Sequence, residues 1–327
     1  MGIRYAEPPL LMHDVIDDVD AVRRLLRSQA PYVPLGGWYS PGADPHARTR
    51  PMWFRDDWAF DDVAVEGVEL FLHHEGYIEA ARSFYDVEVV EPQSVYTNLM
   101  VGIAEGGPAH TDNPRFHGRD RTNTPMWVLR VMLWSGLFDD YEILQATAIW
   151  WLNDVAEGGG LRYWANGPDA PPLEHVGAMA NTALFGDNHG MFHQVGPVGP
   201  FDEGTRLVTP SAQLGPVGDA DPSSPRDGAE PWAVVDHGEE VFRTTLDQIR
   251  VSVLWKADVY PTAAERDARL ADQLSKQDVA AVFDADLRER GSDVRFDLER
   301  LDDPALKAEL ASVYPEAVPV DALASAF

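Results

Sequence analysis

The stretch that decides the fold is "SVYTNLMVGIA", residues 94–104. Apolar residues alternate with the others along it, so that Val95 and Leu99 point to one side of an extended chain and Asn98 to the other. A period of two predicts a β-strand with one face in a hydrophobic core. We therefore expect a β-strand here, with two different environments on its two faces.

The regions around this strand differ in their pattern of apolar and turn-forming residues. Residues 94–257 form short strand-like runs separated by Gly, Pro, Asn and Asp, which is typical of a β-sandwich or barrel. Apolar residues at helical spacing dominate residues 14–93 and residues 258–327. Residues 123–140 fit a strand and a helix equally well. We expect one domain, 1–327, with a β core between an N-terminal helical support and a C-terminal helical region.

One long segment interrupts the β region. Residues 207–231, "LVTPSAQLGPVGDADPSSPRDGAEP", are rich in Pro, Gly, Asp and Ser and contain few large apolar side chains. This composition predicts a loop inserted into the core. Loops of such length are usually either functional, as lids are, or simply mobile, and the sequence favours neither alternative.

The composition excludes several kinds of partner and site. A formal net charge of −28 disfavours binding to nucleic acid, which requires Lys and Arg to neutralise phosphates, and it favours a monomer or a weak homo-oligomer. The chain has no cysteine, so any metal must be bound by nitrogen and oxygen atoms. No secretion signal or membrane-length apolar run is present, and we expect a cytoplasmic protein.

The turn after the first strand carries a His-x-Asp tripeptide, His110 and Asp112 in "GGPAHTDNPRFHG". In an extended chain both side chains point to the same side. Two histidines and one carboxylate on one face of the ion form the facial triad of non-haem Fe(II) sites. The preferred third ligand is His193, in the strand-like run "GMFHQVGPV", and the alternative is His189, in the turn-like "GDNHG".

The last long strand-like run places Arg250 and Ser252 on one face and Val251 on the other. A guanidinium group is suited to bidentate binding of a carboxylate, and a hydroxyl can add a hydrogen bond. The other interpretation of Arg250 is a structural salt bridge in an acidic protein. Arg206 is the alternative for the carboxylate-binding position, because it follows His193 by 13 residues.

The order of these motifs resembles that of the Fe(II)/2-oxoglutarate-dependent oxygenase superfamily: His-x-Asp, then "GGGL" at 158–161, a distal histidine, and Arg-x-Ser. The resemblance covers roughly residues 94–257. It implies a mainly β core, a cupin-like double-stranded β-helix or jelly-roll, with flanking α-helices. It also implies that the Fe(II) ligands are His110, Asp112 and His193.

The resemblance further implies two cosubstrates, 2-oxoglutarate and O2. Arg250 and Ser252 would hold 2-oxoglutarate, with Tyr96 and Asn98 of the first strand beside it. The expected reaction releases succinate and CO2 and oxidises a small molecule through a ferryl intermediate, most simply by hydroxylation. One departure is the 57 residues from His193 to Arg250, because the family usually has a short connection there.

Two further arginines are candidates for binding an anionic substrate, Arg115 beyond the His-x-Asp tripeptide and Arg162 on the "GGGL" strand. The competing interpretation is charge pairing in a protein with 54 acidic residues. For the whole chain, the alternative function is that of a cupin-like metal-dependent isomerase, or of a jelly-roll that binds sugar or another ligand without using 2-oxoglutarate.

Overall fold

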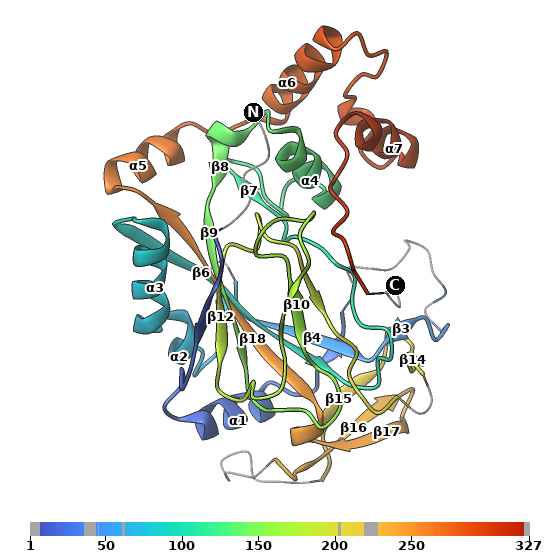
Figure 1. Ribbon diagram of the computed structural model, residues 1–327. Helices are drawn as coiled ribbons and strands as arrows, with labels where there is room; N and C mark the ends of the chain where they lie inside the picture. Colours follow the sequence, from blue (N-terminus) through green and yellow to red (C-terminus); the bar gives the residue numbers. More distant parts are fainter. Residues whose placement is uncertain are drawn as a thin grey trace.

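One large antiparallel sheet organises the chain, with strands from distant parts of the sequence (Figure 1). The computed structural model describes residues 7–35, 44, 46–60, 63–201, 204–218 and 228–323. Within these residues the strand order is β1 (Leu10–Met12), β12 (Ala183–Gly186), β9 (Gln145–Trp151), β18 (Arg250–Tyr260), β6 (Val89–Met100), β4 (Trp53–Phe60) and β2 (Val33–Pro34), with β5 (Val63–Ala64) paired to β4.

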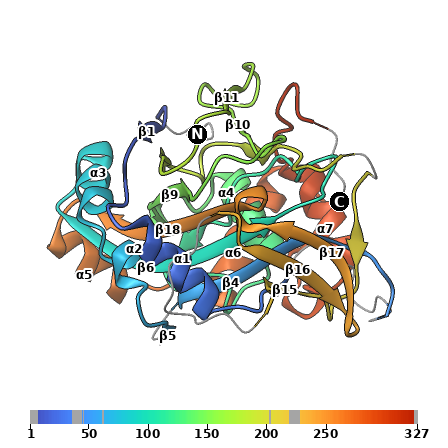
Figure 2. The same cartoon turned by 90° about the horizontal axis from the view of Figure 1, so that it is seen from below.

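A small antiparallel sheet faces the large one. It has the order β11 (Leu173–His175), β10 (Leu161–Tyr163) and β13 (His193–Val195). Isolated backbone bridges, Ile103 to Val198 and His110 to His193, bring the chain that follows β6 alongside β13. Figure 2 shows β10 and β11 on one side of β18 and β6, and helix α1 on the other.

Successive segments alternate between the two sheets. The chain passes from β6 in the large sheet to residues 103–110 beside the small one, returns to β9, crosses to β10 and β11, and then repeats this through β12, β13 and β18. This alternation is that of a double-stranded β-helix, or jelly-roll. The expectation of a mainly β core with helices before and after it is confirmed.

The period of two along the central strands separates two hydrophobic clusters. Val251 and Val253 of β18 belong to the outer cluster, whereas Leu254 belongs to the inner one, which faces the small sheet. Burying one such side chain stabilises the fold by about 1.5–3 kcal/mol. The outer cluster packs under three N-terminal helices, α1 (Val19–Ser28), α2 (Glu69–Leu72) and α3 (Glu75–Tyr85).

A separate helical cluster lies at one end of the molecule (Figure 1). Residues 123–140, which fitted a strand and a helix equally well, contain α4, whose buried side chains include Leu129 and Met132. α6 begins with the reciprocal capping box of Ser275 and Asp278 that its sequence predicts. The helices of this cluster are α4 (Met126–Ser135), α6 (Lys276–Glu289) and α7 (Pro304–Val313), and α5 (Ala263–Ala271) connects β18 to α6.

The N-terminal region is not entirely the helical support that was expected. β4 lies within it and pairs with β6 over seven residue positions. Its sequence, "WFRDDWAF", buries Phe54 and Trp58 against the outer cluster and presents Arg55 to the inner side. Pairing with a neighbouring strand outweighs the weak local pattern here, because strand stability depends on cross-strand contacts.

The segment expected as a loop, 207–231, is only partly irregular. It contains β14 (Leu207–Val208) and β15 (Gln213–Pro216), while residues 219–227 lie outside the described part of the chain. β15 pairs with β16 (Pro231–Asp236), which pairs with β17 (Glu239–Thr245). Trp232 and Val234 of this sheet join the outer cluster. The long connection between His193 and Arg250 therefore contains a packed sheet.

The remaining elements are short. They are the strands β3 (Arg50–Pro51), which pairs with β14, and β7 (Arg115–Phe116), which pairs with β8 (Glu142–Ile143), and the 3₁₀-helices Asp139–Tyr141, Leu246–Gln248 and Leu298–Arg300. Among the described residues, no helix combines the length and the apolar character that crossing a bilayer would require.

Candidate active site

Three residues far apart in the sequence meet between the sheets. The backbone N–H of His110 donates to the carbonyl of His193 at 3.0 Å, and the N–H of His193 donates back at 2.9 Å. This pair of bonds brings the two imidazole centroids to 4.4 Å. Asp112 completes the group, since one ligand atom of each residue lies within 4.8 Å of the others.

Both histidines have a defined proton position. The Nδ1 atom of His110 lies 2.8 Å from the Pro108 carbonyl, and that of His193 lies 3.2 Å from the Met191 carbonyl. Because a carbonyl only accepts, Nδ1 carries the proton and Nε2 keeps its lone pair. Burial lowers the pKa of His110 to about 4 and also lowers that of His193. Both rings are thus neutral at pH 7, the form that binds metal.

Asp112 has a partner that the sequence interpretation missed. The Lys256 Nζ atom lies 2.7 Å from Oδ2, and Oδ1 faces His193 Nε2 at 3.6 Å. Burial alone would raise the pKa of Asp112, but the positive Lys256 and the two imidazoles lower it well below its usual range. The carboxylate is therefore ionised, with one oxygen held by Lys256 and the other directed to the cluster.

This donor set fits Fe(II). Two neutral imidazole nitrogens and one carboxylate oxygen make up the 2-His-1-carboxylate triad, and the outer atoms of all three residues are held by hydrogen bonds. Such contacts orient metal ligands. The cluster also lines a cavity, which leaves room for further ligands on the metal.

The cavity has a volume of about 970 Å³, within the range of small-molecule sites. The inner face of the large sheet forms its floor, where β18 contributes every second residue, from Arg250 through Ser252 and Leu254 to Lys256. Arg250 and Ser252 were predicted from the sequence to share one face of this strand. The same spacing of two residues extends to Lys256 and could have identified it.

Arg250 lies in this floor with a charge that has no counter-ion. It is 3% exposed; its Nε donates to the Gly159 carbonyl at 2.7 Å and Nη1 to Ser252 Oγ at 3.2 Å. Among the described residues, Nη2 has no hydrogen-bond partner and no carboxylate lies within ion-pair distance of the guanidinium. Burial lowers the pKa of Arg250 to about 9. The alternative of a structural salt bridge is therefore not what the described structure contains.

Arg206, the alternative candidate for binding the carboxylate, lies elsewhere. The Arg206 guanidinium lies over the Phe242 ring, 4.8 Å from its centroid, and Arg206 does not contribute to the cavity lining. His189, the rival ligand, is buried but is not part of the three-residue cluster. In both cases the structure brings the preferred residue, and not the alternative, to the cavity.

Tyr96 and Asn98 of β6 also line the cavity. In the register of the sheet, Asn98 lies beside Ser252 and Tyr96 beside Leu254. The Asn98 Oδ1 accepts from Trp53 Nε1 at 3.2 Å, which restricts the rotation of its amide. Burial raises the pKa of the Tyr96 hydroxyl, which therefore stays protonated at pH 7.

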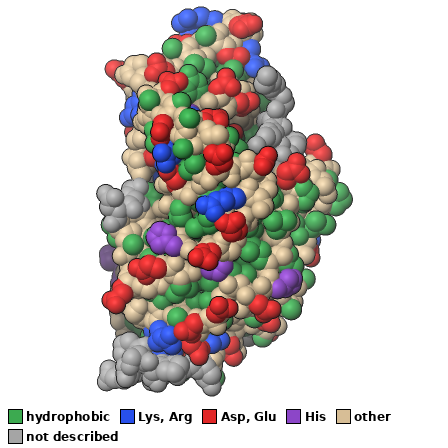
Figure 3. Space-filling view, turned by 90° about the vertical axis from the view of Figure 1, so that its left-hand side faces the viewer, with side chains coloured by type: hydrophobic (Ala, Val, Ile, Leu, Met, Phe, Trp, Pro, Cys, Tyr) green, Lys and Arg blue, Asp and Glu red, His purple; other side chains and the backbone are tan. Residues whose placement is uncertain are grey.

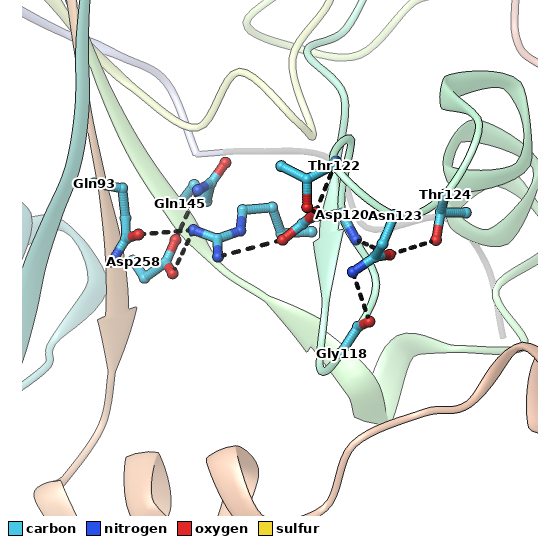
Figure 4. Close-up of polar contacts among 9 residues, drawn as sticks. Gln93, Gly118, Asp120, Thr122, Asn123, Thr124, Gln145 and Asp258 are labelled. Carbon is cyan, nitrogen blue, oxygen red and sulfur yellow. Dashed lines mark hydrogen bonds and ion pairs between the residues drawn. The ribbon is translucent and has the colours of Figure 1, made fainter. Parts of the chain in front are cut away.

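Arg115 and Arg162 both have acidic partners. Arg115 lines the cavity, but it donates to Gln93 at 3.0 Å and to Asp258 at 2.8 Å; Figure 4 shows these acceptors with the adjoining Asp120 turn. Burial raises the pKa of Asp258 to about 6, although Arg115 opposes this. Arg162 pairs with Glu174 and does not line the cavity. Their structural interpretation, charge pairing, therefore matches the contacts observed.

The C-terminal segment 315–323 contributes Glu316 to the cavity lining and is hydrogen-bonded to residues near the small sheet. The buried Gln194, next to His193, donates to the carbonyls of Gly107 at 2.8 Å and Leu323 at 3.0 Å, and it accepts from the Leu323 N–H at 2.8 Å. Trp164 Nε1 donates to the Val320 carbonyl at 2.8 Å. These contacts tie Val320 and Leu323 to Gln194 of β13 and to Trp164, which follows β10.

No protein-family model matches the sequence, and no curated protein matches it. Solved structures with some likeness include a prolyl hydroxylase from Trichoplax adhaerens bound to a peptide of hypoxia inducible factor (10% identity, 81% of this chain and 86% of that chain, TM-score 0.39). Others are a 2OG-Fe(II) oxygenase from Burkholderia pseudomallei (11%, 78% and 88%, 0.39) and the alpha-ketoglutarate-dependent epimerase SnoN from nogalamycin biosynthesis (11%, 77% and 77%, 0.38).

The strand order and the His-Asp-His cluster are features of this chain itself and do not depend on these distant likenesses. The chain has a jelly-roll fold with a His-Asp-His cluster between its two sheets.

Proposed function

We propose that the chain is an Fe(II)- and 2-oxoglutarate-dependent oxygenase that oxidises a small molecule, with hydroxylation as the simplest outcome. The observation that carries this proposal is the buried Arg250, whose Nη2 has no partner among the described residues although it lies on the same cavity floor as the His-Asp-His cluster. A buried charge without a partner is costly. An anionic ligand in the cavity would supply the missing partner.

The residues around Arg250 suit one end of 2-oxoglutarate. A carboxylate at Nη2 would also lie within reach of Ser252 Oγ, which already accepts from Nη1 at 3.2 Å. Gly159 holds the guanidinium by its Nε at 2.7 Å, so the group is oriented before any ligand arrives. Because the site is buried, such an ion pair is little weakened by solvent.

His110, Asp112 and His193 would hold the iron. When bound, iron supplies the activation of dioxygen that couples oxidation of 2-oxoglutarate to succinate and CO2 with oxidation of the substrate. The chain's contribution is to fix these ligands: two backbone carbonyls hold the imidazole protons, and Lys256 holds the second carboxylate oxygen. Fixed ligands keep the same positions in the apo and the loaded protein.

The rest of the cavity would position the substrate. Trp127 and Trp134 of α4 and Tyr314 beyond α7 line it opposite the sheet. These aromatic side chains exclude water from the reacting centre and present flat apolar surfaces to a ligand. Selection of the substrate is therefore expected to depend on the helical end of the molecule as much as on the sheet.

The test is an anaerobic titration of the Fe(II)-loaded protein with 2-oxoglutarate. We expect a weak visible charge-transfer band, which Arg250→Met abolishes while Fe(II) remains bound. Arg206→Met is the matched control and should keep the band. Fe(II) binding with no band in the unaltered protein would favour the cupin-like alternative, and the absence of Fe(II) binding would refute the oxygenase.

A further inference from the structure

The cavity has the opposite charge balance to the rest of the protein. The chain contains 26 Lys and Arg against 54 Asp and Glu. On the face shown in Figure 3, acidic side chains outnumber basic ones. The cavity lining instead includes seven Arg or Lys and four Asp or Glu. A positive cavity in a negative protein attracts anions and repels cations.

Three of these seven basic groups are neutralised by carboxylates outside the arginine pair described below. Lys256 pairs with Asp112, Arg115 with Asp258 and Asp120, and Arg130 with Glu316. Arg250 is the group assigned above to 2-oxoglutarate. The basic residues of the lining that remain for a substrate are Arg55, Arg121 and Lys307, and of these only Arg55 and Arg121 lie together.

Among the described residues, Arg55 and Arg121 share a single carboxylate, that of Asp57. Arg55 Nη2 lies 2.7 Å from Asp57 Oδ1, and Arg121 Nη2 lies 3.6 Å from Asp57 Oδ2. The neighbouring Asp56 belongs to the other face of β4, since it pairs with the fully buried outer-face residue Thr97 in the sheet register. Within the described part of the chain, two guanidinium groups with one shared carboxylate leave one positive charge on the cavity wall.

Both guanidinium groups are held in place by aromatic rings. The Cζ atom of Arg55 lies 3.8 Å from the centroid of Tyr96, and that of Arg121 lies 4.1 Å from the centroid of Phe60. Stacking fixes the planes of both groups and leaves their N–H edges for a ligand. Both are partly exposed, Arg55 by 22% and Arg121 by 38%, so an incoming anion can reach them.

The position of this pair suits the substrate and not 2-oxoglutarate. β4 is two strands from β18, so the row of Arg55 and Asn98 reaches Ser252 across about 10 Å of sheet. The Arg55 guanidinium lies over the Tyr96 ring, and Tyr96 lines the same cavity as Lys256 and Asp112. A molecule bound by the arginine pair would cross the Tyr96 ring to reach the metal cluster.

We propose that Arg55 and Arg121 form a subsite for an oxyanion group of the substrate, so that the substrate is a small organic acid with an apolar or aromatic body. This inference rests on the proposed function for the identity of the reacting centre. The excess positive charge of the arginine pair indicates that the substrate carries an oxyanion. The aromatic surfaces of Tyr96, Trp127 and Trp134 indicate that the rest of the substrate is apolar.

The test compares two probes of equal shape, 1-naphthoate and 1-naphthamide, on the protein loaded with Mn(II) and saturating 2-oxoglutarate. In the unaltered protein we expect naphthoate to bind about tenfold more tightly, as a charge-assisted hydrogen bond predicts. Arg55→Gln and Arg121→Gln should each reduce that ratio toward one. Asp57→Asn should increase it, because it frees both arginines. Arg243→Gln, in an exposed pair with Glu240, is the control and should not change it.

Several results would overturn the subsite. Equal binding of the two probes would do so. A preference for naphthoate that survives both arginine substitutions would also do so. The same holds if naphthoate displaces 2-oxoglutarate, because naphthoate would then be bound by Arg250. Retained 2-oxoglutarate binding shows that each variant is folded. The anaerobic Fe(II) band tests the proposed function separately: the band without a naphthoate preference refutes only the subsite, and its absence from the unaltered protein refutes the function.

Discussion

Replacing Arg250 by methionine should stabilise the ligand-free protein. Arg250 is buried, and its charge has no counter-ion among the described residues. The lowering of its pKa from 12.5 to about 9 corresponds to about 5 kcal/mol for keeping the charge there. Methionine has a similar shape and no charge, and replacing buried charged groups by apolar ones often stabilises proteins.

The expected gain is smaller than that cost. The substitution also removes the hydrogen bonds from Arg250 to Gly159 and Ser252, each worth about 1 kcal/mol, and water in the cavity lessens the penalty on the charge. We therefore expect the free energy of unfolding to rise by about 1–3 kcal/mol in Arg250→Met.

The assay is chemical denaturation of the Mn(II)-loaded protein with and without 2-oxoglutarate. A ligand at one hundred times its Kd stabilises its protein by about 2.7 kcal/mol, so 2-oxoglutarate should cancel the advantage of the variant. Arg250→Met itself should not respond to the ligand, and Arg206→Met should respond as the unaltered protein does. A ligand-free Arg250→Met protein that is less stable than the unaltered one would refute the view of Arg250 as an uncompensated charge.

Three further predictions concern the surroundings of the site. His193→Ala should abolish the visible spectrum of bound Co(II), whereas His189→Ala should retain it; the reverse result would move the distal ligand to the alternative histidine. Burial raises the pKa of Asp258 from 3.8 to about 6, so this residue contributes stability below pH 4 that is lost as the pH rises through 6. Relative to Asp258→Asn, the unaltered protein should lose up to about 3 kcal/mol between pH 4 and pH 7 in denaturant titrations, and a constant difference would contradict this. Gln194→Leu should lower the free energy of unfolding by about 2–4 kcal/mol, because it leaves three backbone groups of Gly107 and Leu323 without partners; a proteolysis assay should then detect release of the C-terminal segment, and an unchanged cleavage pattern would count against its anchoring by Gln194.

Local pattern was sufficient for much of the fold. The alternation in residues 94–104 led to the strand that carries Tyr96 and Asn98, and the same parity placed Arg250 and Ser252 together on β18. Capping residues at Ser275 and Asp278 identified the start of α6. Such features are readable in sequence because they depend on neighbours along the chain.

Features that depend on pairing across the sheets were not readable in this way. β4 was expected to be helical, so Arg55 and Asp57 were not considered for the cavity, and Arg121 reaches them from a turn more than sixty positions later. The small sheet within the long connection also became apparent only once its apolar residues had a core to pack against.

The sequence by itself determined which chemical groups are available. It has no thiols, and it has a His-x-Asp tripeptide, a further histidine on a strand, and an arginine and a serine on one face of another strand. Only the tertiary structure decided which of these groups meet. It selected His193 over His189 and Arg250 over Arg206 for the cavity, and it supplied Lys256 as the partner of Asp112. The physical reason is that strand parity sets the face on which a side chain lies, whereas its neighbours on that face are set by hydrogen bonds between strands distant in sequence.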